Sequence, residues 1–255
     1  MPWDPAQYLK FAGPRLRPAL DLLQRIDREH PARVYDLGAG AGNVTRLIAA
    51  RWSEARVIGV DGSAEMLAKA AAENPGIEWQ EADLATWRPN APAEIIYSNA
   101  ALQWLDDHDK LFPRIFAELA PGGVLAVQIP RNFSAPSHTS ITDSALAGPW
   151  RNTLEPLLRP SPVAEPGFYY DLLAPLARSL DIWETEYLQV LDGPNPVKEW
   201  TKGTWLAPLL AALEEPERGQ FEADYAARVA AAYPPRGDGK TLFPFRRLFL
   251  IATAP

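Results

Sequence analysis

A glycine-rich turn with an acidic residue in front of it is the clearest chemical feature of this sequence. The stretch reads Asp36-Leu37-Gly38-Ala39-Gly40-Ala41-Gly42-Asn43 and follows a short apolar segment. Closely spaced glycines let a backbone turn tightly and let a ligand approach the main chain. The pattern therefore predicts a nucleotide-binding turn, with Asp36, Gly38 and Gly40 beside the ligand.

Spacing and charge distinguish two classes of ligand at this turn. Dinucleotide-binding folds use G-x-G-x-x-G, whereas here the third glycine comes one residue early and Asn43 stands in the place of the last glycine. A dinucleotide would also place a pyrophosphate where the carboxylate of Asp36 repels it. S-adenosylmethionine carries an ammonium and a sulfonium instead, which a carboxylate attracts. The turn favours S-adenosylmethionine.

Two more acidic residues follow predicted strands, in the order that nucleoside binding requires. Asp61 ends an apolar segment and could bind both hydroxyls of a ribose; both cofactor classes use such an acid, so Asp61 supports a nucleoside without choosing between them. Asp83 could accept a hydrogen bond from an adenine amino group. We predict that Gly62 lines this site and that Met66 and Leu84 enclose the adenine ring.

Alternating strands and helices are needed to position these residues. The pattern predicts strands over 33–37, 56–61, 77–82, 94–98 and 124–129, with helices over 43–52, after a capping Ser63, and over 109–119. Such alternation is typical of right-handed βαβ units and of a parallel sheet covered on both faces. Two later strands, 181–191 and 247–253, flank two or three helices within 196–233 and predict an antiparallel edge hairpin with a lid between its arms.

Several motifs resemble those of a known enzyme class. The D-L-G-x-G-x-G at 36–42, the V-D-x-S at 60–63 and the E-A-D-L at 81–84 are similar to class I S-adenosylmethionine-dependent methyltransferases. Further segments resemble the trans-aconitate 2-methyltransferases within that class. These are W-D-P at 3–5 with Tyr8, Phe11-Ala12 and Arg15 to Pro18, S-N-A-A-L-Q-W at 98–104, L-A-V-Q-I-P at 125–130, Y-Y-D-L-L at 169–173 and R-L-F at 247–249.

The resemblance implies a fold and an activity. The fold would be α/β and Rossmann-like, a doubly wound and mostly parallel seven-stranded sheet with an antiparallel edge strand and a helical lid insertion. One domain would span 1–255, with an N-terminal helical segment (1–29) over the cofactor and lid or acceptor-binding insertions at 131–178 and 192–240. The enzyme would methylate a carboxylate oxygen of a small polycarboxylic acid, most closely trans-aconitate, to a monomethyl ester and release S-adenosylhomocysteine.

The resemblance also assigns residues to the cofactor. It places Asp36, Gly38 and Gly40 at the methionyl end, Asp61 on the ribose and Asp83 at the adenine. Asn99 would face the sulfonium with Trp104 nearby, while Trp3, Tyr8 and Arg17 would come from the N-terminal segment. One departure concerns Arg131, which puts a cation where relatives carry an acid, so the acceptor pocket is expected to differ.

Carboxylate methylation sets its own chemical demands. A carboxylate is already ionised at neutral pH, so no general base and hence no catalytic side chain is expected. The main cost is desolvation of a multiply charged anion, which cationic and hydrogen-bonding side chains offset. The candidate anion ligands are Arg17, Arg131, His138, Tyr169, Tyr170, Arg246 and Arg247, with Arg17 and Arg247 foremost and with His138 and Tyr169 expected in lid loops. His108 is expected to cap a helix rather than to act as a base.

Composition excludes several other classes of protein. The chain has 255 residues, with 25 basic and 32 acidic side chains and a net charge of −7, which disfavours a nucleic-acid binder. It has no cysteine and only three histidines, so neither a disulfide framework nor a bound metal is expected. Without an apolar run of about 20 residues, no membrane span is expected. A cytoplasmic protein with a small anionic acceptor is the prediction, and its oligomeric state stays open.

Two alternatives remain at this point. One is a methyltransferase of another small acceptor, such as a phenol, an amine or a carbon acid. The other is an oxidoreductase that uses the same fold for a dinucleotide, against which the glycine spacing and Asp36 argue.

Overall fold

The computed structural model describes the backbone of residues 12–255 and the side chains from residue 16 onward. Two predicted cofactor-binding residues, Trp3 and Tyr8, lie outside the described residues. Among the helices that are described, none has the length and apolar character that crossing a bilayer requires.

One sheet of seven strands organises the chain, in the order β3-β2-β1-β4-β5-β7-β6. The strands are β1 (Arg33–Leu37), β2 (Arg56–Asp61), β3 (Glu78–Glu81), β4 (Ala93–Asn99), β5 (Leu119–Pro130), β6 (Ser179–Leu191) and β7 (Thr241–Thr253). Strands β1 to β5 pair in parallel, and β7 pairs with β5 antiparallel. The predicted doubly wound α/β fold with an antiparallel strand near one edge is confirmed.

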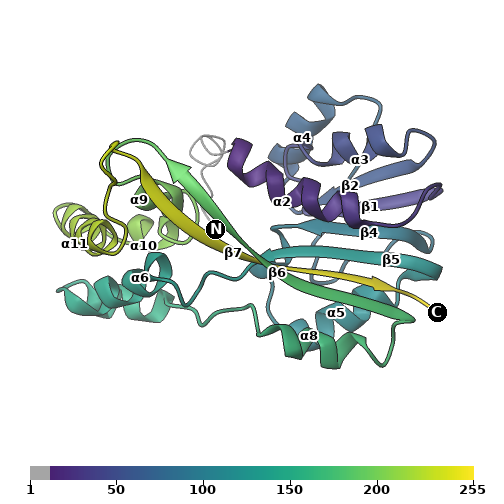
Figure 1. The fold of residues 1–255 in the computed structure, drawn as a ribbon. Coiled ribbons are helices and arrows are strands. Elements are labelled where there is room, and N and C mark those ends of the chain that lie inside the picture. The colour runs from purple at the N-terminus through teal and green to yellow at the C-terminus, as the bar shows by residue number, and fades with distance from the viewer. Residues whose placement is uncertain (1–11) are drawn as a thin grey trace. The chain divides into compact units, whose positions relative to one another are not determined.

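Helices cover both faces of this sheet. Figure 1 shows α2 (Ala12–Arg25), α3 (Thr45–Arg51) and α4 (Ala64–Glu73) on one side, with α5 (His108–Phe116) and α8 (Pro166–Leu173) on the other. Central strands that are covered on both faces need apolar side chains throughout, and Ile95, Ile96 and Tyr97 of β4 are accordingly fully buried. The Tyr97 hydroxyl donates to the carbonyl of Ala19 at 2.8 Å, which fastens α2 to its face.

The ends of two strands differ from the prediction. We expected Pro121-Gly122-Gly123 to end a helix before a strand at 124, but β5 already begins at Leu119. Gly122 has a φ of 71°, and the pairing of β4 with β5 shifts register between Ala93 and Ile95, so the strand pair accommodates the irregular residues. Strand β7 begins at Thr241 rather than at Arg247, since Pro244 interrupts the apolar pattern without ending the strand.

The chain divides into two compact units. The sheet unit comprises 16–130, 162–185 and 247–255, and the helical unit comprises 131–161 and 186–246. Strands β6 and β7 each run from one unit into the other. Of the expected insertion at 131–178, residues 162–178 group with the sheet unit. That the remaining inserted segments act as a lid stays a prediction.

The helical unit has a hydrophobic core of its own. It contains α6 (Pro136–Ala147), α7 (Arg151–Leu154), the 3₁₀ turn η2 (Glu155–Leu157), α9 (Pro196–Lys202), α10 (Ala207–Ala211) and α11 (Glu217–Ala232). Trp200, Phe221 and Phe243 are among its buried residues, and Trp205 packs against them. The predicted role of Trp200, Trp205 and Phe221 as core residues is confirmed.

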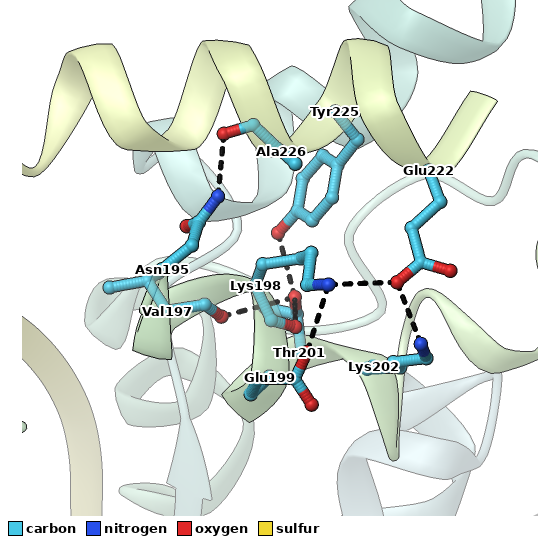
Figure 2. A network of polar contacts seen from close by, with 9 residues as sticks. All are labelled: Asn195, Val197, Lys198, Glu199, Thr201, Lys202, Glu222, Tyr225 and Ala226. Atoms are coloured by element: carbon cyan, nitrogen blue, oxygen red, sulfur yellow. Dashed lines mark hydrogen bonds and ion pairs between the residues drawn. The ribbon is translucent and has the colours of Figure 1, made fainter. Parts of the chain in front are cut away.

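Polar contacts join α9 to α11 beside this core (Figure 2). The carboxylate of Glu222 accepts from Lys198 at 2.9 Å and from Lys202 at 2.6 Å. The hydroxyls of Thr201 and Tyr225 lie 2.7 Å apart, and Tyr225 also donates to the carbonyl of Ser137 at the start of α6. Three helices that are distant in the sequence are thereby held together.

Candidate active site

The glycine-rich turn after β1 is held against β2 by its backbone. The amides of Gly38 and Ala39 both donate to the carbonyl of Val60, at 2.8 and 3.0 Å. Gly38 has a φ of 81°, and a Cβ placed on it would overlap the Cβ of Ala101. A side chain at this position is therefore excluded both by conformation and by space.

Asp61 at the end of β2 is fixed beside this turn. Its two carboxylate oxygens accept from the amides of Gly40 and Ser63, at 2.8 and 2.9 Å. Ser63 also caps α4, since its hydroxyl accepts from the amide of Met66. A Cβ on Gly40 would lie 3.6 Å from the Cε of Met66, so Met66 reaches the same turn.

Asp36 at the end of β1 is buried, with 2% of its surface exposed. Burial raises the pKa of Asp36 to about 7; a hydrogen bond from Thr45 opposes this shift, and the charge of Asp61 adds to it. The Thr45 hydroxyl donates to the Asp36 carboxylate at 2.6 Å. The charge of Asp61 raises the electrostatic energy of an ionised Asp36, so the two carboxyl groups form a site that a cation would stabilise and a phosphate would not.

The predicted adenine end lies along the loop after β3. Gly62, Glu81, Ala82 and Asp83 line an open pocket of about 630 Å³. Asp83 is exposed, and one of its carboxylate oxygens accepts from the amide of Ala85 at 2.9 Å. The Cδ1 of Leu84 lies 3.9 Å from the position of a Cβ on Gly38, which places Leu84 beside the glycine-rich turn.

The segment that follows β4 lies against the glycine-rich turn through Ala101. Asn99 ends the strand and its Oδ1 is a buried atom without a hydrogen-bond partner in the described part of the chain. Ala100 has a φ of 54°, an uncommon conformation for a residue with a Cβ and one that is often found at functional sites. Trp104 follows in the 3₁₀ turn η1 (Leu102–Trp104) and is half-buried.

These residues fit the predicted cofactor. The sheet unit brings Asp36, Gly38, Gly40, Asp61, Met66, Leu84 and Asn99 to the carboxyl ends of neighbouring strands, where α/β sheets bind their ligands. The acidic pair suits the ammonium of S-adenosylmethionine, Asp61 and Asp83 suit its ribose and adenine, and the orphaned Asn99 oxygen suits a positively charged sulfonium centre. Among the described residues, no group of three or more acidic residues and histidines could hold a metal.

The sheet unit also holds two candidates for binding an anionic acceptor. Arg247 lies on β7, is only 4% exposed, and donates from a guanidinium nitrogen to the Oε1 of Gln128 at 3.1 Å. Arg17 lies on α2 and is exposed. A buried guanidinium at the carboxyl end of β5 is the more unusual of the two, because burying a cation is costly.

Tyr169 does not lie in a lid loop as predicted. It belongs to α8, is fully buried, and its hydroxyl lies 2.7 Å from the Nδ1 of His108. His108 is the first residue of α5 and not its cap, which is Asp107, and its Nε2 lies 3.0 Å from the carbonyl of Leu102. Tyr169 therefore supports the segment after β4 through His108, whereas its neighbour Tyr170 is 56% exposed.

The other candidates belong to the helical unit. His138 lies in helix α6 rather than in a loop, its Nδ1 is 3.0 Å from the Ser137 hydroxyl, and burial lowers its pKa to about 4. Arg131 and Arg246 pair through their backbones, with the Arg131 amide donating to the Arg246 carbonyl at 3.0 Å. A neutral imidazole at physiological pH would bind an anion as a hydrogen-bond donor and not as a charge.

Two residues of the site escaped the sequence interpretation. Thr45 is buried against Asp36 in the first turn of α3, and Gln128 is a fully buried amide in an otherwise apolar strand. The signal for Gln128 was present, because a polar residue inside the run Val124 to Ile129 breaks the pattern of a buried strand.

Comparisons with known proteins give the family and the fold of this chain. A family model described as a methyltransferase domain matches residues 34–123, which span the glycine-rich turn and the Asn99 segment. A solved phosphoethanolamine N-methyltransferase 2 from Haemonchus contortus, in complex with S-adenosyl-L-methionine, has a similar fold, with a TM-score of 0.57 and 17% identity over 98% of this chain and 56% of that one.

Two curated proteins are much more similar in sequence. A trans-aconitate 2-methyltransferase from Azoarcus sp. is 50% identical over 250 residues, which cover 98% of either chain. Another from Rhodopseudomonas palustris is 47% identical over 251 residues, again with 98% of either chain covered. This chain therefore belongs to the trans-aconitate 2-methyltransferase family of S-adenosylmethionine-dependent methyltransferases.

Proposed function

We propose that this protein methylates a carboxylate of trans-aconitate and thereby forms a monomethyl ester. The single observation that carries the proposal is the acidic pair at the glycine-rich turn, Asp36 and Asp61, in a chain that is 50% identical to a trans-aconitate 2-methyltransferase along its length. The pair supports a cationic methyl donor, and the relative's acceptor supports a polycarboxylate.

Different residues of the sheet unit would bind different parts of the methyl donor. Asp61 would accept from the ribose hydroxyls, Asp83 from the adenine amino group, and Asp36 would bind the ammonium group. When bound, S-adenosylmethionine supplies a methyl group activated by its sulfonium. A carboxylate oxygen of the acceptor forms a bond to the methyl carbon, while the electron pair of the broken carbon–sulfur bond remains on sulfur, giving the ester and S-adenosylhomocysteine.

The environment of His108 supports a mechanism without a general base. Both ring nitrogens of His108 have close hydrogen-bond partners inside the protein, Tyr169 and Leu102, and burial lowers its pKa. A phenol or amine acceptor must lose a proton, whereas a carboxylate is already ionised. The chain would therefore act by orienting the acceptor and excluding water, with Arg17, Tyr170 and Arg247 of the sheet unit as proposed acceptor-binding residues.

Direct assay tests this proposal. The full chain is incubated with methyl-labelled S-adenosylmethionine and trans-aconitate, and the ester is identified by mass spectrometry. We expect one equivalent of monomethyl ester for each S-adenosylhomocysteine formed. Tight binding of S-adenosylhomocysteine without any ester would reject the acceptor and leave the cofactor assignment standing.

A further inference from the structure

Three buried side-chain atoms near the carboxyl ends of β4 and β5 lack hydrogen-bond partners within the described part of the chain. They are Asn99 Oδ1, Gln103 Oε1 and Gln128 Nε2. Most buried polar atoms in folded proteins are paired, and an unpaired one calls for a ligand or an ordered water. Three such atoms in one region indicate a place where a polar ligand completes the structure.

Existing hydrogen bonds determine which kind of atom each of the two glutamines presents. Gln128 accepts from Arg247 through its Oε1, so its amide nitrogen, a donor of two protons, points elsewhere. Gln103 donates from its Nε2 to the carbonyl of Ala100 at 2.7 Å, so its unpaired atom is an acceptor. The unpaired atoms are therefore of two kinds. Those of Asn99 and Gln103, at the end of β4 and after it, are acceptors, and that of Gln128, on β5, is a donor.

Strand register places the donor beside the predicted reacting centre. Asn99 pairs with Gln128 in the parallel ladder, and Gln128 pairs with Phe249 in the antiparallel one. Paired residues share a face, and so does Arg247, two residues before Phe249. Gln128 is therefore one strand spacing, about 4.8 Å, from Asn99 and lies on the same face as the buried guanidinium.

We propose that Gln128 is a specificity-determining residue that binds a non-reacting carboxylate of the acceptor. Its Nε2 donates to the carboxylate, and Arg247 holds the amide in the orientation that makes this possible. With its oxygen already occupied by Arg247, the Gln128 amide offers N–H donors and no acceptor, which suits a carboxylate, a group that only accepts. This inference rests on the proposed function and deepens it.

Two variants of nearly equal size test the inference. Gln128→Met removes both N–H donors, and Gln128→Glu replaces them with a carboxylate that repels the acceptor. We expect either change to raise the KM for trans-aconitate by about 10- to 100-fold, the effect of losing a hydrogen bond to a charged group, with affinity for S-adenosylhomocysteine unchanged. The matched control, Gln189→Met, alters another buried glutamine, on β6, and should behave as wild type.

Smaller acceptors distinguish a direct contact from a structural role. Itaconate, mesaconate and glutaconate each lack one of the three carboxylates of trans-aconitate, and their inhibition constants are measured for wild type and for both variants. A direct contact predicts that one of the three inhibits all proteins equally, because it lacks the carboxylate that Gln128 binds.

These experiments distinguish an error in the role of Gln128 from an error in the proposed function. Failure of the wild type to form any ester counts against the acceptor itself. An active wild type whose KM for trans-aconitate is unchanged in both variants overturns the inference, and so does loss of S-adenosylhomocysteine binding in both. Equal weakening of all three small acceptors would also overturn it, because Gln128 would then act on the fold of the pocket as a whole.

Discussion

At the scale of single residues, the carboxyl group of Asp36 is buried in an environment that disfavours its ionised form. In the folded chain the pKa of Asp36 is about 7, against 3.8 for an ordinary carboxyl group. The unfolded chain therefore loses this proton at lower pH than the folded chain, and the free energy of unfolding falls as the pH rises from about 4 to about 7. A bound cation would stabilise the ionised form of Asp36 and so restore the lost free energy of unfolding, which links the buried charge of Asp36 to ligand binding.

Replacing Asp36 by Asn removes the buried charge. Since only the wild type carries the penalty of ionisation, we expect the stability of the variant relative to wild type to rise by about 2–3 kcal/mol between pH 5 and pH 8. Urea unfolding of the ligand-free proteins at both pH values measures this difference. The exposed Asp83→Asn is the control, and an equal difference for Asp36→Asn at both pH values would contradict the assigned pKa.

Gly38 tests the steric argument for the glycine-rich turn. Because its φ is 81° and a Cβ would overlap Ala101, we expect Gly38→Ala to lower the free energy of unfolding by about 2 kcal/mol or more and to weaken S-adenosylhomocysteine binding. Gly76→Ala is the control, since nothing lies within 4 Å of a Cβ there. Thermal unfolding and calorimetry report the two effects, and wild-type values for Gly38→Ala would refute the argument.

At the scale of elements, α5 and α8 support the segment after β4 through a buried relay. A carbonyl can only accept, so His108 donates from Nε2 to Leu102, and its Nδ1 accepts from the Tyr169 hydroxyl. The same hydroxyl accepts from the amide of Ala164 at 3.3 Å. Through His108, the buried Tyr169 of α8 thus positions η1 next to Asn99.

Removing one hydroxyl tests this relay. Tyr169→Phe leaves the Nδ1 of His108 and the amide of Ala164 without their partner, so we expect a loss of about 1–3 kcal/mol of stability and a lower kcat with little change in the KM for the acceptor. Tyr170→Phe, at an exposed position of the same helix, should match wild type in stability. If Tyr169→Phe instead raised only the acceptor KM, Tyr169 would contact the acceptor after all.

At the scale of the whole molecule, the negative net charge argues against a nucleic acid as the acceptor. With 25 basic and 32 acidic side chains the chain lacks the excess of cations that displaces counterions from a phosphate backbone. We expect no binding of labelled duplex DNA or transfer RNA in fluorescence anisotropy, even at a low salt concentration of about 50 mM. Binding that weakens steeply with added salt would contradict this expectation.

The fold of the sheet unit was largely predictable because its signals are local. Apolar runs such as Val57 to Val60, each followed by an acidic or glycine residue, mark buried strands and their carboxyl ends without knowledge of the rest of the chain. Strand ends were less predictable where Pro121 and Pro244 occur, since a proline is tolerated at a register shift or near a strand end that the sequence does not reveal.

The positions of the candidate acceptor-binding residues were harder to predict than those of the candidate cofactor-binding residues. Asp36, Asp61 and Asp83 follow strands at positions that the order of parallel strands brings together, so their proximity follows from topology. The sequence around Tyr169 and His138 carries no such signal. Only tertiary packing decides that the hydroxyl of Tyr169 faces the buried His108.

By itself the sequence predicted the succession of strands and helices along the chain, the glycine-rich turn, and the acidic residues that favour a cationic cofactor. Those features depend on residue type and spacing along one stretch of chain. Only the tertiary structure decided that Gln128 presents its nitrogen and that Thr45 bonds Asp36. These properties depend on contacts between segments up to 119 residues apart, as from Gln128 to Arg247, and hydrogen-bond direction is set by the partner rather than by the residue.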